Sequence, residues 1–107
     1  MKKYILTTFS LPVKGREVEY DHWYSEVHCQ DLLRIPEIKS AQRFRTLPHP
    51  EQPERPFLVI YEIETDDISS VMQALQNDTY EMRPSDAIDP ASVTLQVYEV
   101  IGKKQLS

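Results

Sequence analysis

The order in which strand-like and helix-like segments follow one another constrains the fold of this chain more than any other feature. Strands are predicted where β-branched and aromatic residues gather between turn residues, and helices where apolar residues recur every three or four positions. The expected strands are Lys3–Phe9, Ile38–Leu47, Phe57–Ile63 and Val93–Val100, with helices from about Arg16 to Leu33 and between Thr65 and Asp78. This β-α-β-β-α-β order predicts an α+β, ferredoxin-like fold, with a four-stranded antiparallel sheet and both helices on one face.

Length and charge limit the class of protein. The 107 residues suit one domain, residues 1–107, and a proline-rich loop is expected at His49–Pro56. The net charge of −5 argues against nucleic acid and anionic membrane surfaces, because phosphate contacts need a basic surface. No run approaches the roughly 20 apolar residues that span a bilayer. A single cysteine, Cys29, fits a reducing compartment, so a cytoplasmic location is expected.

The first helix has an apolar side that two polar residues interrupt. The apolar side holds Tyr20, Trp23, Tyr24, Val27 and Ile35, and the opposite side holds His22, Ser25, Glu26 and Cys29. Asp31 falls near the middle of the apolar side and His28 on its flank, three positions apart and therefore within reach of each other. A carboxylate that faces a core needs a hydrogen-bonding partner or a pocket. Cys29 is expected to be a surface thiol.

The sheet is expected to be apolar on both faces. Val93, Leu95 and Val97 alternate with Thr94, Gln96 and Tyr98, and Phe57, Val59 and Tyr61 alternate with Leu58 and Ile60. An apolar face of this size is rarely left to water. We therefore expect a second copy to pack against it, with Gln96 and Tyr98 lining the space between the two sheets.

The run Trp23-Tyr24-x-x-x-His28-x-x-Asp31-Leu32-Leu33-x-x-Pro36, followed by a strand with Arg43 and Phe44, resembles the dimeric α+β barrel proteins, most of all the EthD-type group. Muconolactone isomerases and antibiotic-biosynthesis monooxygenases are more distantly similar. The resemblance implies a homodimer with one small-molecule pocket per subunit between sheet and helices. It also implies that His28 faces this pocket, with Trp23 and Asp31 beside it.

These residues suggest proton transfer next to a carbonyl or phenol group. A histidine beside a carboxylate can accept or donate a proton, with Asp31 orienting His28. Tyr24 or Tyr98 would then donate a hydrogen bond to the developing oxyanion. This inventory suits a lyase or isomerase that needs no cofactor. In the structural alternative, Asp31 bridges backbone groups near the helix end and His28 satisfies it.

Other interpretations remain open at this point. A monooxygenase or a non-catalytic small-molecule-binding protein could use the same fold. Arg43 either binds an anionic group of the substrate or faces solvent. The segment from Thr79 to Ser92 is either a cover over the pocket, with Tyr80 touching the ligand, or a packed surface loop. No metal site is expected, because His22 and Glu26 share helical spacing but have no third ligand.

Overall fold

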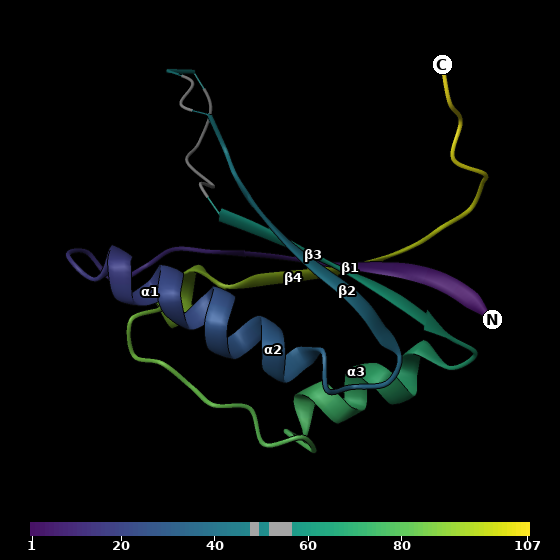
Figure 1. The fold of residues 1–107 in the computed structure, drawn as a ribbon, viewed down its shortest axis with the longest axis horizontal. Coiled ribbons are helices and arrows are strands. Elements are labelled where there is room, and N and C mark those ends of the chain that lie inside the picture. Colours follow the sequence, from purple (N-terminus) through teal and green to yellow (C-terminus); the bar gives the residue numbers. More distant parts are fainter. Residues whose placement is uncertain (48–49, 52–56) are drawn as a thin grey trace.

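A computed structural model describes residues 1–47, 50–51 and 57–107 of the chain. The elements are β1 (Lys2–Ser10), α1 (Glu17–Trp23), a π-helical turn η1 (Tyr24–His28), α2 (Cys29–Leu32), β2 (Ile38–Arg45), β3 (Phe57–Thr65), α3 (Ile68–Gln76), a 3₁₀ turn η2 (Pro90–Ser92) and β4 (Thr94–Glu99). The antiparallel sheet has the order β2-β3-β1-β4, and the helices lie along one side of it (Figure 1). The predicted α+β ferredoxin-like arrangement is confirmed.

Strand ends follow the pairing partners rather than the local sequence. β3 extends two residues beyond its predicted end because Thr65 pairs with Lys2. β2 stops at Arg45, before the predicted Leu47, where it reaches Phe57, the first residue of β3. Residues 49 and 52–56 of the predicted proline-rich loop lie outside the described part of the chain.

The core lies between the helices and one face of the sheet. Residues that pair across strands share a face, and on the helix side β1 contributes Tyr4, Leu6, Thr8 and Ser10, whereas β3 contributes Val59, Tyr61 and Ile63. The opposite face, which we call the open face, carries Ile5, Phe9, Phe44, Leu58, Ile60 and Tyr98. Phe44 and Tyr98 remain 41% and 45% exposed on it. The predicted two-sided apolar character of the sheet is therefore present.

The first helix is interrupted by the π turn, which changes the face of the residues after it. The backbone N–H of Cys29 donates to the carbonyl of Tyr24, five residues back. A π turn holds one more residue than an α turn, so later residues are rotated by about 100° from their expected direction. Cys29 therefore faces the sheet, is buried, and lies 3.9 Å from the hydroxyl of Tyr61. The prediction of a surface thiol is wrong, and burial raises the pKa of this thiol.

α3, the second of the two helices that the sequence predicts, begins and ends where the sequence indicates. The side chain of Asp67 accepts a hydrogen bond from the backbone N–H of Ser70, which caps the first turn of α3. Val71 is buried, and Ile68, Met72 and Leu75 pack against the core. Asp78, with a φ of 52°, turns the chain away after Asn77.

Residues 78–89, which we call the strap, run from α3 past α1 and α2 towards β4 (Figure 1). At its end, the strap forms backbone hydrogen bonds with the segment that follows β1. The backbone N–H of Val13 donates to Ala87, which is fully buried, and Asp89 donates to Leu11. None of the helices in the described part of the chain has the length and apolar content required to cross a bilayer.

Candidate functional site

His28 is the last residue of the π turn and packs between two aromatic rings. Its ring stacks on Trp23 at 4.6 Å between centroids, and meets the edge of Tyr24 at 5.3 Å. The Nδ1 atom of His28 is buried and has no hydrogen-bond partner among the described residues. Burial lowers the pKa of His28 to about 4, and the negative charge of Asp31 opposes this shift only in part. The imidazole is therefore neutral at neutral pH.

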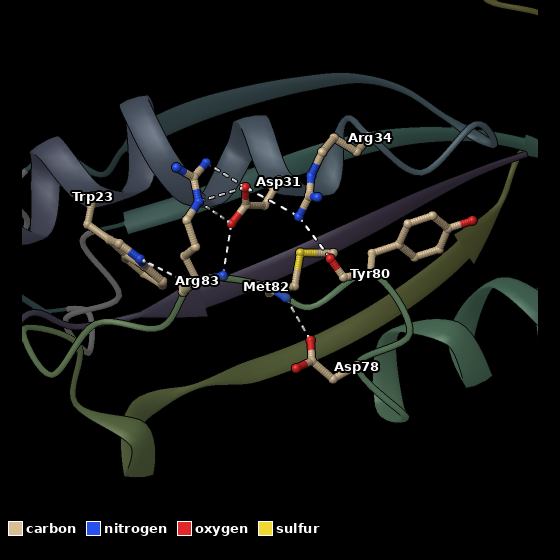
Figure 2. A network of polar contacts seen from close by, with 7 residues as sticks. All are labelled: Trp23, Asp31, Arg34, Asp78, Tyr80, Met82 and Arg83. Atoms are coloured by element: carbon tan, nitrogen blue, oxygen red, sulfur yellow. Dashed lines mark hydrogen bonds and ion pairs between the residues drawn. The ribbon is translucent and has the colours of Figure 1, made fainter.

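Asp31 is buried, and its partner is Arg83 of the strap instead of His28 (Figure 2). Its carboxylate accepts hydrogen bonds from the Nη2 of Arg83 at 2.6 Å and from the backbone N–H of Arg83 at 2.9 Å. Arg34 adds an ion pair at 3.5 Å. The Arg83 side-chain hydrogen bond is the main reason that the pKa of Asp31 falls to about 2.

The expected hydrogen-bonded pair of His28 and Asp31 is therefore not formed in this structure. A guanidinium neutralises a buried carboxylate and offers several donors, whereas a neutral imidazole offers one donor and no charge. The alternative prediction, in which Asp31 binds backbone groups, agrees with the structure in one respect. The carboxylate of Asp31 accepts a hydrogen bond from the backbone N–H of Arg83. That residue lies in the strap, far along the chain from the end of the first helix.

Arg83 is the residue of the candidate site that the sequence analysis did not identify. Both backbone groups of Arg83 are held by the first helix: Asp31 accepts from its N–H, and the indole N–H of Trp23 donates to its carbonyl at 3.0 Å (Figure 2). Nearby, Arg34 donates to the carbonyl of Tyr80 at 2.9 Å. One sequence signal was available, since Arg83 is the only Lys or Arg between residues 79 and 92 and the buried Asp31 required a cation.

Tyr24 directs its hydroxyl to the sheet and not to His28. The hydroxyl lies 3.1 Å from the Oγ of Ser10, which is also 2.6 Å from the hydroxyl of Tyr20. The hydroxyl of Thr8 lies close enough to reduce the pKa of Tyr24, although burial has the larger effect and raises it. The Thr8 Oγ1 is buried without a hydrogen bond of ordinary geometry to any described residue. Two unpartnered polar atoms, in Thr8 and His28, therefore flank Tyr24.

Arg43 has its positive charge compensated within the fold. Its guanidinium donates to the carboxylate of Asp21 at 2.7 Å and to Ser25 at 2.9 Å. It also lies over the rings of Tyr24 and Tyr20, at 5.3 and 5.9 Å. The alternative in which Arg43 faces solvent is wrong, because most of the Arg43 side chain is covered.

Three other predicted site residues belong to other parts of the fold, namely β4 and the strap. Gln96 and Tyr98 pair with Thr7 and Ile5, so they lie on the open face, with the sheet between them and the helices. Tyr80 lies on the strap, where its half-buried side chain packs against the core. The sequence thus identified Trp23, Tyr24 and His28 as one cluster, whereas Gln96 and Tyr98 belong to the other side of the sheet.

An open groove of about 650 Å³ lies next to this cluster, between the first helix and the strap. Its lining residues are Glu19, His22, Trp23, Val27, Pro84, Ser85 and Asp86. Trp23 belongs both to the groove wall and to the ring stack on His28, whereas His28 itself is not among the residues that line the groove. Among the described residues, no group of three or more His, Cys, Asp and Glu side chains is placed to hold a metal ion.

The sequence matches no family model and no curated protein. The structure, in contrast, is similar to the crystal structure of an ethyl tert-butyl ether D (EthD) family protein from Bacillus halodurans. The TM-score is 0.59 at 17% sequence identity, and the match covers 94% of this chain and 100% of the other. The chain therefore has an EthD-like fold.

Proposed function

We propose that this protein acts on a small, partly apolar molecule with an oxo or phenolic group, as a lyase or isomerase in which neutral His28 is the general base. The observation that carries the proposal is the buried Nδ1 of His28, which has no hydrogen-bond partner among the described residues. Buried polar atoms are nearly always paired, so an orphaned one needs an explanation such as a missing water or ligand. A π turn supports the same interpretation, because such turns are frequent at functional sites.

The low pKa of His28 defines what kind of proton it can remove. A base with a pKa of about 4 is weak, so it suits an acidic C–H next to a carbonyl or a phenolic O–H. Negative charge that develops on the bound substrate would raise the pKa of His28 as the proton moves. The buried imidazolium then returns the proton readily, as isomerisation and dehydration both require. No cofactor is invoked in these steps.

Trp23 and the strap supply the binding surface in this proposal. The groove has the volume expected of a small-molecule site, and the indole of Trp23 forms its wall beside His28. A ligand in the groove reaches the imidazole by displacing Trp23, whose indole N–H is held by the Arg83 carbonyl. In this proposal the strap controls access to His28, which is the cover alternative, and not the packed-loop alternative, for residues 79–92. Arg43 positions Tyr24 and has no anion to bind, since Asp21 already occupies it.

We also propose that the protein is a cytoplasmic homodimer in which two open faces pack together to form the barrel. Phe44 and Tyr98 expose apolar area there, and Gln96 adds a polar group to the same face. Tyr98 and Gln96 would then bind substrate only if the space between the sheets communicates with the helix side.

Proton abstraction can be tested without knowing the natural substrate. A panel of 1,3-diketones, β-keto esters and phenols is incubated with the protein in D₂O, and NMR measures deuterium uptake at the carbon next to the oxygen-bearing group. We expect the protein to accelerate uptake for part of the panel, and His28→Ala to abolish that acceleration. Gln30→Ala is the matched control, because Gln30 is an exposed residue of α2.

The outcomes separate the candidate functions. Unchanged deuterium uptake in His28→Ala would end the role of His28 as the base. Binding of panel members without any uptake would favour the non-catalytic binding protein. Oxygen consumption with a phenolic member of the panel would favour the monooxygenase.

A further inference from the structure

The π turn η1 departs from the geometry of a continuous α-helix. In an α-helix each backbone carbonyl accepts a hydrogen bond from the N–H four residues later. At η1 the N–H of Cys29 donates to Tyr24, five residues back, and the N–H of Tyr24 donates to both Tyr20 and Asp21. Turns of this kind are rare. Contacts from outside the helix are therefore expected to favour this turn over a continuous α-helix.

Arg43 of β2 supplies such contacts at the start of the turn. Its Nη1 atom donates to the backbone carbonyl of Asp21 at 3.3 Å and to the Oγ of Ser25, a residue of η1, at 2.9 Å. Its Nη2 atom donates to the carboxylate of Asp21 at 2.7 Å. One guanidinium thus binds the residue group that precedes the turn and a residue within the turn. A side-chain donor that reaches a helix carbonyl is a known cause of a local change in helix geometry.

The sheet holds Arg43 in the direction of the helix. Arg43 is paired with Val59, which is buried on the helix side, so both residues lie on that face of the sheet. The guanidinium also lies over the rings of Tyr24 and Tyr20, and the side chain is only 23% exposed. Because a guanidinium is planar and donates in fixed directions, it can bind several acceptors only when they lie at set positions. Arg43 thereby connects the position of β2 to the geometry of the first helix.

The π turn decides where two chemical groups of the first helix lie. It places the thiol of Cys29 3.9 Å from the hydroxyl of Tyr61, and it ends at His28, whose ring stacks on Trp23. Without the extra residue of the π turn, the residues that follow would be rotated by about 100°. Cys29 would then face solvent, as helical periodicity predicts. His28, the last residue of the turn, would be displaced from the ring stack.

We infer that Arg43 is a positioning residue, which fixes the π turn and through it the places of His28 and Cys29. The inference goes beyond the proposed function, because it holds whether or not His28 is a base. Replacement of Arg43 by glutamine removes the charge and the fork of donors. The first helix then samples the continuous α-helical geometry, in which Cys29 is accessible and His28 is more exposed to water.

The thiol of Cys29, the only cysteine of the chain, reports this change. The folded protein is treated with a chromogenic disulfide reagent, and the labelling rate of Arg43→Gln is compared with that of the unchanged protein. After correction for the unfolded fraction measured in urea, we expect labelling to be about tenfold faster or more, through local opening. Arg45→Gln is the charge-matched control, because Arg45 is an exposed residue of the same strand. Ile63→Val is the stability control, because Ile63 is buried in β3, and its labelling should follow the unfolded fraction alone.

His28 gives an independent measurement of the same turn. In an NMR titration of the ring carbons, we expect the midpoint of His28 to rise in Arg43→Gln from about 4 towards its usual value, because a displaced ring is better solvated. Ser25→Ala removes only the contact between Arg43 and the turn itself. It is expected to change the labelling rate and the midpoint in the same directions by smaller amounts. Ser25→Ala also provides the test if Arg43→Gln does not fold.

The results separate this inference from the proposed function, because neither measurement depends on proton abstraction. Cys29 labelling that follows the unfolded fraction alone in Arg43→Gln and in Ser25→Ala would overturn the positioning role of Arg43. A His28 midpoint that stays near 4 in folded Arg43→Gln would also overturn it, because the π turn would then persist without Arg43. Failure of His28 as the base in the D₂O experiment would leave the positioning role standing.

Discussion

His28 stays neutral although a carboxylate lies three residues away. The charge of Asp31 is shared by Arg83 and Arg34, so two positive charges meet one negative charge. The negative charge of Asp31 therefore stabilises the protonated imidazole of His28 only weakly. Desolvation has the larger effect and lowers the pKa of His28. The sequence indicated that His28 and Asp31 are neighbours. It could not indicate the sign of the shift, because that sign depends on Arg83, which only the fold brings close.

The depressed pKa of His28 predicts a specific loss of stability in mild acid. The pKa is about 4 in the folded state and about 6.5 in the unfolded state, so between these values the unfolded chain binds more protons. Stability therefore rises with pH across this window and is lost as the pH falls through it, by roughly 3 kcal/mol at most. Urea unfolding at several pH values measures this loss. His28→Gln is expected to remove most of it, and the same pH dependence in the variant would assign it to other groups.

Thr8 offers a second prediction at this scale. Its buried hydroxyl lacks a hydrogen bond of ordinary geometry, so Thr8→Val is expected to be neutral or to stabilise the fold by up to about 1 kcal/mol. Ser10→Ala is the matched control on the same strand, and it should destabilise by about 1–3 kcal/mol because Tyr20 and Tyr24 lose their partner. Thermal and urea unfolding compare the two. A Thr8→Val loss as large as that of Ser10→Ala would mean that the hydroxyl is satisfied.

Among the elements, the π turn explains why helical periodicity predicted only part of the first helix. Positions up to Tyr24 lie where about 100° per residue places them, and Tyr20 and Tyr24 are buried as expected. After the π turn the same periodicity placed Cys29 on the wrong side. The sequence pattern has no break at residues 24–28, so the expected rotation of about 100° per residue was carried past the π turn unchanged.

The strap is the element whose role depends most on contacts that are distant in sequence. Arg83→Gln removes the charge that neutralises Asp31, and we expect the strap to open more often. Amide hydrogen exchange should become faster at Met82 and Arg83, and the emission of Trp23, the only tryptophan, should shift as its bond to Arg83 is lost. Arg45→Gln serves as the control, since Arg45 is an exposed residue of β2. If amide hydrogen exchange is unchanged in Arg83→Gln, the contacts of Ala87 at the end of the strap are sufficient to keep the strap in place without Arg83.

At the scale of the whole molecule, the order of elements was enough to predict the fold. Strand pairing, the face covered by helices and the apolar open face all follow from which segments are strands and which residues alternate. The candidate site was only partly predictable, because part of it depends on contacts between residues that are distant in the sequence. Trp23, Tyr24 and His28 lie within one short helical segment, whereas the strap reaches them only in the folded chain.

The open face carries a prediction about assembly. Phe44→Glu introduces a charge at a position that is 41% exposed in the single chain, so the fold should tolerate it. In a dimer built on the open faces the same charge would be buried without a partner, and dimer affinity should fall by about tenfold or more. Sedimentation at micromolar concentration, with Val18→Glu on α1 as the control, measures the change. Equal sedimentation of Phe44→Glu and the unchanged protein would exclude this face as the interface.

The protonation of His28 can be followed directly, because proton transfer by a neutral, partner-free imidazole is the centre of the proposed function. NMR of the ring carbons in histidine-labelled protein gives the midpoint, and His28→Gln assigns the resonance. We expect a midpoint near the value of about 4 that burial imposes, far below the usual value of about 6.5. A midpoint at or above about 6.5 would contradict this, because His28 would then be exposed to water or paired with a carboxylate.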